Sequence, residues 1–184
     1  MIKALIVVCF VTLVVVPAMA RGPQYVKVDN QVVYEIPIGS PVGHGTVGEF
    51  GVVEYQGRFK VSGHYEYGYV TDDPDADASY GEKEFAFILD GPSASQLPYW
   101  TRDGRIQELD FRNRDDFINA VIPKRELEKL SAHKITSVSG IATVWAEKLQ
   151  TSVECDRQHN SAWFSAIAAS DYAVSGSFAE PQGC

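Results

Sequence analysis

An acidic segment, residues 73–84, carries oxygen-bearing side chains at a spacing that suits a metal ion. Asp73, Asp75, Asp77 and Glu84 stand at positions 1, 3, 5 and 12 of this segment. An EF-hand calcium loop uses that spacing, because a hard cation takes six to eight oxygen ligands and a glutamate at position 12 supplies two of them. The spacing therefore fits a calcium site, which makes Ca²⁺ the one candidate cofactor; otherwise no cofactor is expected.

Two features of the same segment favour a simpler interpretation. Position 6, which is glycine in an EF-hand loop, is Ala78 here. The flanking residues have the alternation of strands, whereas the flanks of an EF-hand are helices. The alternative is an acidic, solvated loop that joins two strands.

His64 and Glu66 are the second candidate pair, since residues two apart on a strand share a face. An imidazole beside a carboxylate can act as an acid–base pair in a small hydrolase or as a metal pair, but a plain surface contact is more common. The chain has no Gly-x-Ser-x-Gly, His-Glu-x-x-His or phosphate-binding glycine motif. The sequence therefore favours a protein that is not an enzyme.

Aromatic residues form the third candidate site. Tyr69, Tyr99 and Trp100 are expected beside the loops of the sheet, where rings can stack on a ligand. This pattern predicts a binding domain for a protein, peptide or glycan. The alternative is that the rings belong to the core, and that alternative is favoured for Tyr65 and Tyr67.

The elements that must position these residues are mostly strands. Residues 59–69 alternate between apolar and polar side chains with period 2, which predicts one long strand, bent at Gly63 and Gly68. A turn at 56–58 precedes it. Apolar residues at helical spacing predict two short helices within 113–133, separated by Pro123. Further strands are expected at 84–90, 105–111, 134–149 and 162–167, with a polar loop at 150–161.

This order predicts a mainly β fold with one helical segment: a five-stranded β-β-β-α-β-β barrel over residues 49–169, with an α+β helix-on-sheet arrangement as the alternative. The segments 58–63, 84–90 and 135–140 resemble those of small exported OB-fold-like domains of bacteria. The resemblance implies a barrel and assigns no functional residue.

The two ends of the chain carry separate signals. Residues 1–20 have the basic start, apolar run and small-residue cleavage site of a signal peptide, which predicts a periplasmic or secreted protein without a membrane span after cleavage. Residues 21–48 are expected to form a hairpin followed by a Gly/Pro-rich linker. In an exported protein, Cys155 and Cys184 are expected to form a disulfide that ties down the tail, residues 170–184.

The charge of the chain restricts its partners. The formal net charge is −8, and loss of Lys3 with the signal peptide makes it −9. A surface of this sign repels phosphate backbones, and no long Lys/Arg cluster offsets it. Nucleic acid is therefore excluded as the expected ligand.

Overall fold

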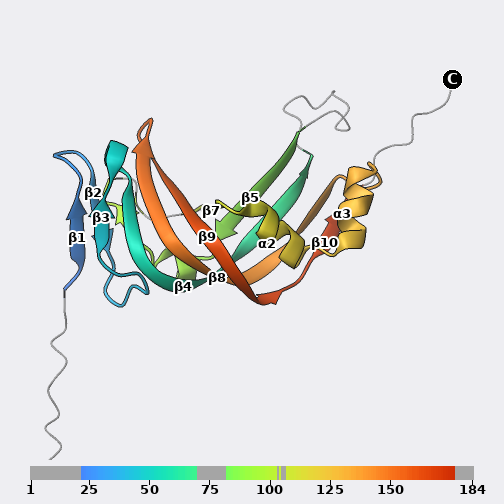
Figure 1. The fold of residues 1–184 in the computed structure, drawn as a ribbon, viewed down its shortest axis with the longest axis horizontal. Coiled ribbons are helices and arrows are strands. Elements are labelled where there is room, and N and C mark those ends of the chain that lie inside the picture. The colour runs from blue at the N-terminus through green and yellow to red at the C-terminus, as the bar shows by residue number, and fades with distance from the viewer. Residues whose placement is uncertain (1–21, 70–81, 103, 105–106, 177–184) are drawn as a thin grey trace, which may run out of the picture.

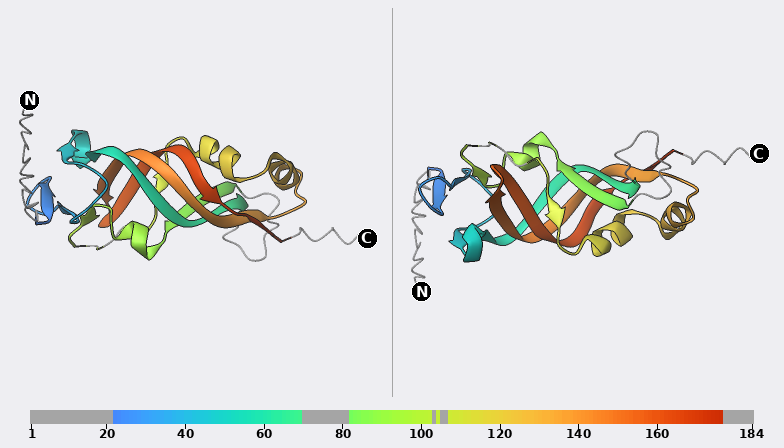
Figure 2. Two further views of the ribbon diagram at one scale, coloured as in Figure 1. Left: turned by 90° about the horizontal axis from the view of Figure 1, so that it is seen from below. Right: turned by 90° about the horizontal axis from the view of Figure 1, so that it is seen from above.

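The computed structural model describes residues 22–69, 82–102, 104 and 107–176. Within them the protein is mainly β with few helices, which confirms the predicted fold class at this level. Three long strands form a strongly curved sheet, and β5, β7 and α2 lie on its inner side (Figure 1). In both views of Figure 2, α1 lies along one long side of the molecule and α2 along the other.

The long sheet is built on β4 (Val53–Tyr69), β8 (Ser137–Glu154) and β9 (Arg157–Ser170), which pair in antiparallel fashion in that order. Shorter strands extend it. β3 (Gly45–Val47) and β5 (Lys83–Leu89) pair with the two ends of β4, β10 (Ala173–Ser175) pairs with the start of β8, and β7 (Asp110–Phe111) runs parallel to β9.

The alternation that predicted the central strand is confirmed in β4. Phe59, Val61 and Tyr65 are buried on the inner face, whereas Lys60 and His64 between them are exposed. The turn predicted at 56–58 is wrong. β4 continues through these residues, and a register shift between Tyr55 and Arg58 absorbs one extra residue as a bulge. Gly57 permits the bulge because its φ is +114°.

The polar loop predicted at 150–161 is also wrong, because β8 and β9 continue through it as one hairpin. Its turn is the pair Cys155 and Asp156, with φ values of 49° and 61°. Positive φ at both central residues matches the right-handed twist of the strands. Cysteine and aspartate take the place of the usual Asn-Gly at this turn, so the hairpin lacks its common sequence signal.

Residues 105 and 106 of the strand predicted at 105–111 lie outside the described part of the chain, and the described remainder contains β7 and one isolated bridge, between Ile88 and Glu108. Two backbone hydrogen bonds flank the bridge: Leu89 donates to Gln107, and Leu109 donates to Phe87. The named strands follow the open path β3-β4-β8-β9-β7. The closed five-stranded barrel therefore stays a prediction.

A second, small sheet consists of β1 (Gln24–Lys27), β2 (Val33–Ile36) and β6 (Tyr99–Trp100). The predicted N-terminal hairpin is confirmed as β1 and β2. The linker expected after it is only partly irregular, because β3 and a 3₁₀ turn, η1 (Glu49–Gly51), lie at its end.

The helical region is confirmed as α2 (Arg114–Val121) and α3 (Lys124–Ser131); α1 (Gly91–Ala94) is a single extra turn capped by Asp90. Asn113 precedes α2 and fixes it to β9. Its side-chain amide donates to the Phe164 carbonyl (2.9 Å), and its side-chain oxygen accepts from the Phe164 N–H (2.8 Å). The Asn113 side chain thus forms the two backbone hydrogen bonds that a neighbouring strand would form at Phe164 of β9.

An aromatic cluster fills the space between α2 and the sheet. The Phe117 ring of α2 stacks on Phe111 (4.9 Å between centroids, 16°) and meets Tyr65, Phe87 and Phe164 edge to face. Such pairs contribute beyond the area that they bury. Phe117 therefore holds α2, β7 and the long strands in one core.

Several predictions fall on residues outside the described part of the chain. The signal peptide and Cys184 are among them, so the Cys155–Cys184 disulfide and the tied tail stay predictions; the Cys155 side chain is exposed at the hairpin turn. Among the described residues, no helix has the length and apolar character needed to cross a membrane.

We expect Tyr65→Phe to lower the free energy of unfolding and to make that free energy less dependent on pH. The phenol donates to the Asp171 carbonyl (2.9 Å), and burial, with the nearby Asp171 carboxylate, raises the pKa of Tyr65 to about 12. The raised pKa means that its contribution is complete below pH 10 and is lost as the pH rises toward 12. Urea unfolding at pH 8 should show a loss of about 0.5–1.5 kcal/mol.

The difference in the free energy of unfolding between wild type and Tyr65→Phe should shrink at pH 11 and above. Tyr67→Phe is the matched control, since Tyr67 is the next inward tyrosine of β4 and is only half-buried. Identical pH profiles for wild type and Tyr65→Phe would contradict this role of the phenol.

Candidate functional site

A recess on the outer face of the long sheet is the strongest candidate site. It has a volume of about 390 Å³ and lies where β4, β5 and the start of β8 meet. Gly68 and Glu84 are paired positions, as are Glu66 and Ala86, so the two glutamates point to the same face from neighbouring strands. Glu108 completes the acidic wall, and none of the described residues that line the recess is a Lys or Arg. We refer to it as the acidic recess.

The acidic recess brings together members of two predicted sites, Glu84 of the calcium set and Tyr69 of the aromatic set. Asp73, Asp75 and Asp77 lie outside the described residues. Over the described ranges, no three His, Cys, Asp or Glu side chains are grouped so that they could hold a metal ion. The calcium site therefore stays a prediction that depends on the three aspartates.

We expect calcium to raise the melting temperature if the acidic segment binds it. Extracellular calcium modules have dissociation constants of about 0.1–1 mM. Thermal unfolding should therefore be compared at about 5 mM calcium and in chelator. Glu84→Gln removes the closing ligand and should abolish the shift, whereas Glu128→Gln on α3 should keep it. An unchanged melting temperature in the wild type would exclude the calcium site.

The Tyr69 ring is already engaged at the edge of the acidic recess. It stacks on His133 at 4.9 Å between centroids, and the Lys83 ammonium lies 5.4 Å from its centroid. His133 has φ of 54° directly after α3, which turns its ring toward β4. This ring contact between His133 and Tyr69 is one that sequence reasoning missed.

Tyr99 and Trp100 are not brought near Tyr69, because they form β6 of the small sheet. Trp100 is only 4% exposed, its indole N–H donates to the Gln31 carbonyl (3.3 Å), and its backbone N–H donates to Gln158 (2.5 Å). Its ring is therefore part of the core. Tyr99 beside it is half-buried. The three aromatics do not form one surface.

His64 lies one row from the acidic recess, between Ile88 of β5 and Ile141 of β8. No hydrogen bond joins it to Glu66 within the described residues, so the acid–base pair expected from the sequence has no geometric support. The two isoleucines are 51% and 60% exposed. They form an apolar rim to the acidic recess.

A second recess, of about 290 Å³, lies beside the β8–β9 hairpin and contains a serine, a histidine and an aspartate. Ser152 and His159 are paired positions, and Asp110 reaches the same recess from β7. The described residues show no hydrogen bond among these three, and Asp110 instead pairs with Arg114 at 3.2 Å. A catalytic triad requires the nucleophile–base and base–acid contacts, so this set is not one.

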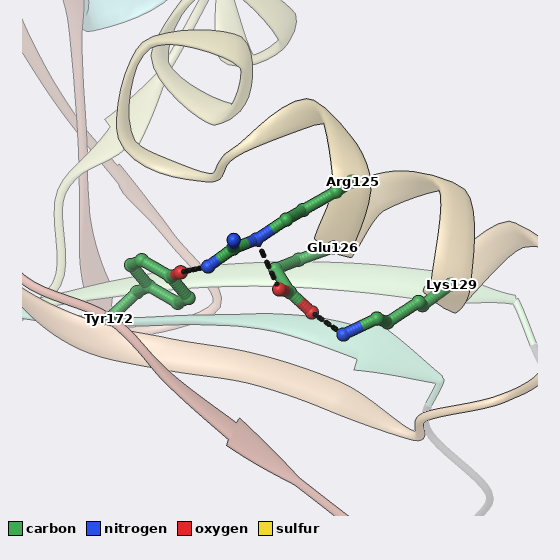
Figure 3. Close-up of polar contacts among 4 residues, drawn as sticks. All are labelled: Arg125, Glu126, Lys129 and Tyr172. Carbon is green, nitrogen blue, oxygen red and sulfur yellow. Dashed lines mark hydrogen bonds and ion pairs between the residues drawn. The ribbon is translucent and has the colours of Figure 1, made fainter.

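A buried carboxylate joins α3 to the chain after β9 (Figure 3). The Glu126 side chain is 4% exposed and accepts from Arg125 (2.9 Å) and Lys129 (3.0 Å). Arg125 donates in turn to the Tyr172 hydroxyl (2.6 Å). The bond from Lys129, with the Arg125 guanidinium, holds the pKa of Glu126 below its usual value. The cluster ties α3 to the segment before β10 and is structural.

We expect Glu126→Gln to lower the melting temperature at pH 7. The lowered pKa means that the carboxylate contributes stability above its ordinary pKa of 4.5, and that this contribution is lost as the pH falls through the folded-state value. The difference in melting temperature between wild type and Glu126→Gln should therefore narrow between pH 5 and pH 3. Glu128→Gln is the control, since that side chain is 67% exposed. A difference that stays constant with pH would refute the assignment.

Comparison with known proteins adds no family to this picture. No protein-family model matches the chain, and neither a curated protein nor a solved structure matches it.

Proposed function

We propose that this protein is an exported, non-enzymatic binding domain whose partner is a basic segment of another protein or peptide. The observation that carries the proposal is the acidic recess, where Glu66, Glu84 and Glu108 line one hollow and the described lining residues include no Lys or Arg. A lysine or arginine of the partner would enter this hollow and meet the carboxylates. Export is supported by the signal-peptide pattern of residues 1–20.

The apolar rim defines the rest of the partner. Ile88 and Ile141 flank His64 in one row across three strands, next to the row that contains Glu66. A partner strand or extended peptide with apolar and basic side chains in alternation would cover the rim and fill the recess together. The net charge of −8 favours the approach of such a partner over long range.

We further propose that the frame of the site is an OB-like barrel. Support comes from the pairing pattern: β5, β4, β8 and β9 pair in antiparallel order, and β7 joins β9 in parallel. The bridge between Ile88 and Glu108 links β5 to the residues before β7, and the helices α2 and α3 lie between β7 and β8. A partly open five-stranded Greek-key barrel has this order.

The test is calorimetric titration of the wild-type chain with a synthetic peptide of alternating lysine and leucine. We expect binding that weakens as salt is added, and a double variant Glu66→Gln/Glu84→Gln that binds about two- to thirty-fold more weakly, since an exposed ion pair contributes about 0.2–1 kcal/mol.

The matched control is Asp115→Asn/Glu128→Gln, which removes two carboxylates from the exposed faces of α2 and α3. It should bind the peptide as the wild type does. An equal loss of affinity in both double variants would mean that only the net charge matters, which would contradict the proposed site. Equal affinity for a glutamate–leucine peptide would also overturn the proposal.

A further inference from the structure

A second group of exposed side chains lies on the outer face of the same sheet, in the two rows around Trp145. Lys60 and Ala166 are the strand partners of Trp145, and Arg58 and Trp163 are those of Glu147 in the next row. Paired positions share a face, and this face is opposite to that of the buried Phe59. We call Arg58, Lys60, Trp145 and Trp163 the basic aromatic patch.

The cations of the patch are held but not neutralised. The Arg58 guanidinium lies 4.9 Å from the centroid of the Trp145 ring, a cation–π distance. Within the described part of the chain, neither Arg58 nor Lys60 forms an ion pair, although Glu147 is the strand partner of Arg58. The patch thus carries two cations without a salt bridge, with one carboxylate, Glu147, beside Arg58, on a protein with net charge −8.

The rings give the patch an apolar surface between and beside these charges. Trp163 is 40% exposed, although a tryptophan of a small domain is commonly in the core. Ala166 beside Trp145 leaves room above the sheet. The outer face of β4 and β8 is the convex side of the curved sheet, which faces away from β5, β7 and α2 (Figure 1).

We propose that the basic aromatic patch binds an acidic oligosaccharide, one that carries carboxylates on its sugar rings. The guanidinium, oriented by the Trp145 ring, presents its N–H fork to a carboxylate, and Lys60 adds a second charge about 7 Å along the strand. The exposed Trp163 ring packs against the apolar face of a neighbouring sugar. This site is separate from the acidic recess, and the inference does not depend on the proposed function.

Other anionic partners fit the patch less well. A nucleic acid is held by several phosphate contacts, whereas the patch offers two cations. A membrane surface with anionic lipid is held by clusters of four to eight Lys or Arg, whereas the patch has two. A uronic-acid sugar matches two cations set among flat rings.

The experiment is titration of the full chain with a trimer of galacturonic acid, followed by tryptophan fluorescence and calorimetry. We expect binding that weakens with added salt, and a loss of at least about fivefold in affinity for Arg58→Gln and for Trp163→Ala. Both side chains are exposed, and circular dichroism checks that each variant folds. Lys124→Gln is the matched control, since its side chain is 90% exposed on α3, and it should bind as the wild type does.

Three results would overturn the inference: no binding of the acidic trimer by the wild type, equal binding of neutral maltotriose, or unchanged affinity in both patch variants. Tighter binding of vesicles with 30% anionic lipid than of the trimer, lost in Arg58→Gln, would assign the patch to a membrane and refute the sugar. Glu66→Gln/Glu84→Gln should leave trimer binding intact, which separates this test from that of the acidic recess.

Discussion

The structure depends on one constraint: β4 must bury an aromatic face on one side and expose a charged face on the other for almost its whole length. Its inner residues pack under Phe117 of α2, and Arg58, Lys60 and Glu66 lie on its outer face. A shift of one residue would exchange the two faces. The bulge between Tyr55 and Arg58 preserves this arrangement, because it absorbs one extra residue without reversing the rest of the strand.

Close backbone approach is the second part of this constraint. A Cβ at Gly63 would collide with the Ile88 carbonyl, and one at Gly68 would collide with the Ser137 Cβ. The missing side chains let β5 and the start of β8 lie against β4, and Gly68 and Ser137 line the acidic recess. The two glycines that the sequence marked as bends are therefore places where neighbouring strands come close.

Sequence reasoning found what local patterns encode. The alternation of residues 59–69 and the helical spacing around Phe117 and Leu130 gave β4, α2 and α3. It failed where pairing partners are distant in sequence. Trp100 is buried because β6 pairs with β2, some 65 residues earlier, and no local pattern reports that. The β8–β9 hairpin was missed because its arms are polar and its turn is Cys155-Asp156.

The exposed tryptophan was missed for a related reason. Trp163 and Phe164 are adjacent, so one of the two had to face outward, and apolarity alone does not tell which. Phe164 is the inner one because it meets Phe117, and the register shift after it keeps Ala166 beside Trp145. A contact with a helix fifty residues away in the chain thus decides the chemistry of the outer face.

Charge is segregated along that outer face, and the distance between the two groups determines how they act. Lys60 and Glu66 are six residues apart on one strand, which is about 20 Å at the rise of an extended chain. The Debye length at physiological salt is about 8 Å, so the field of the acidic recess is largely screened at the basic aromatic patch. Each group therefore meets a ligand through its own local charge. The exposed Ile88 and Ile141, which lie on either side of His64, belong to the acidic end. A single strand with one fixed register can in this way present two surfaces of opposite sign on one face.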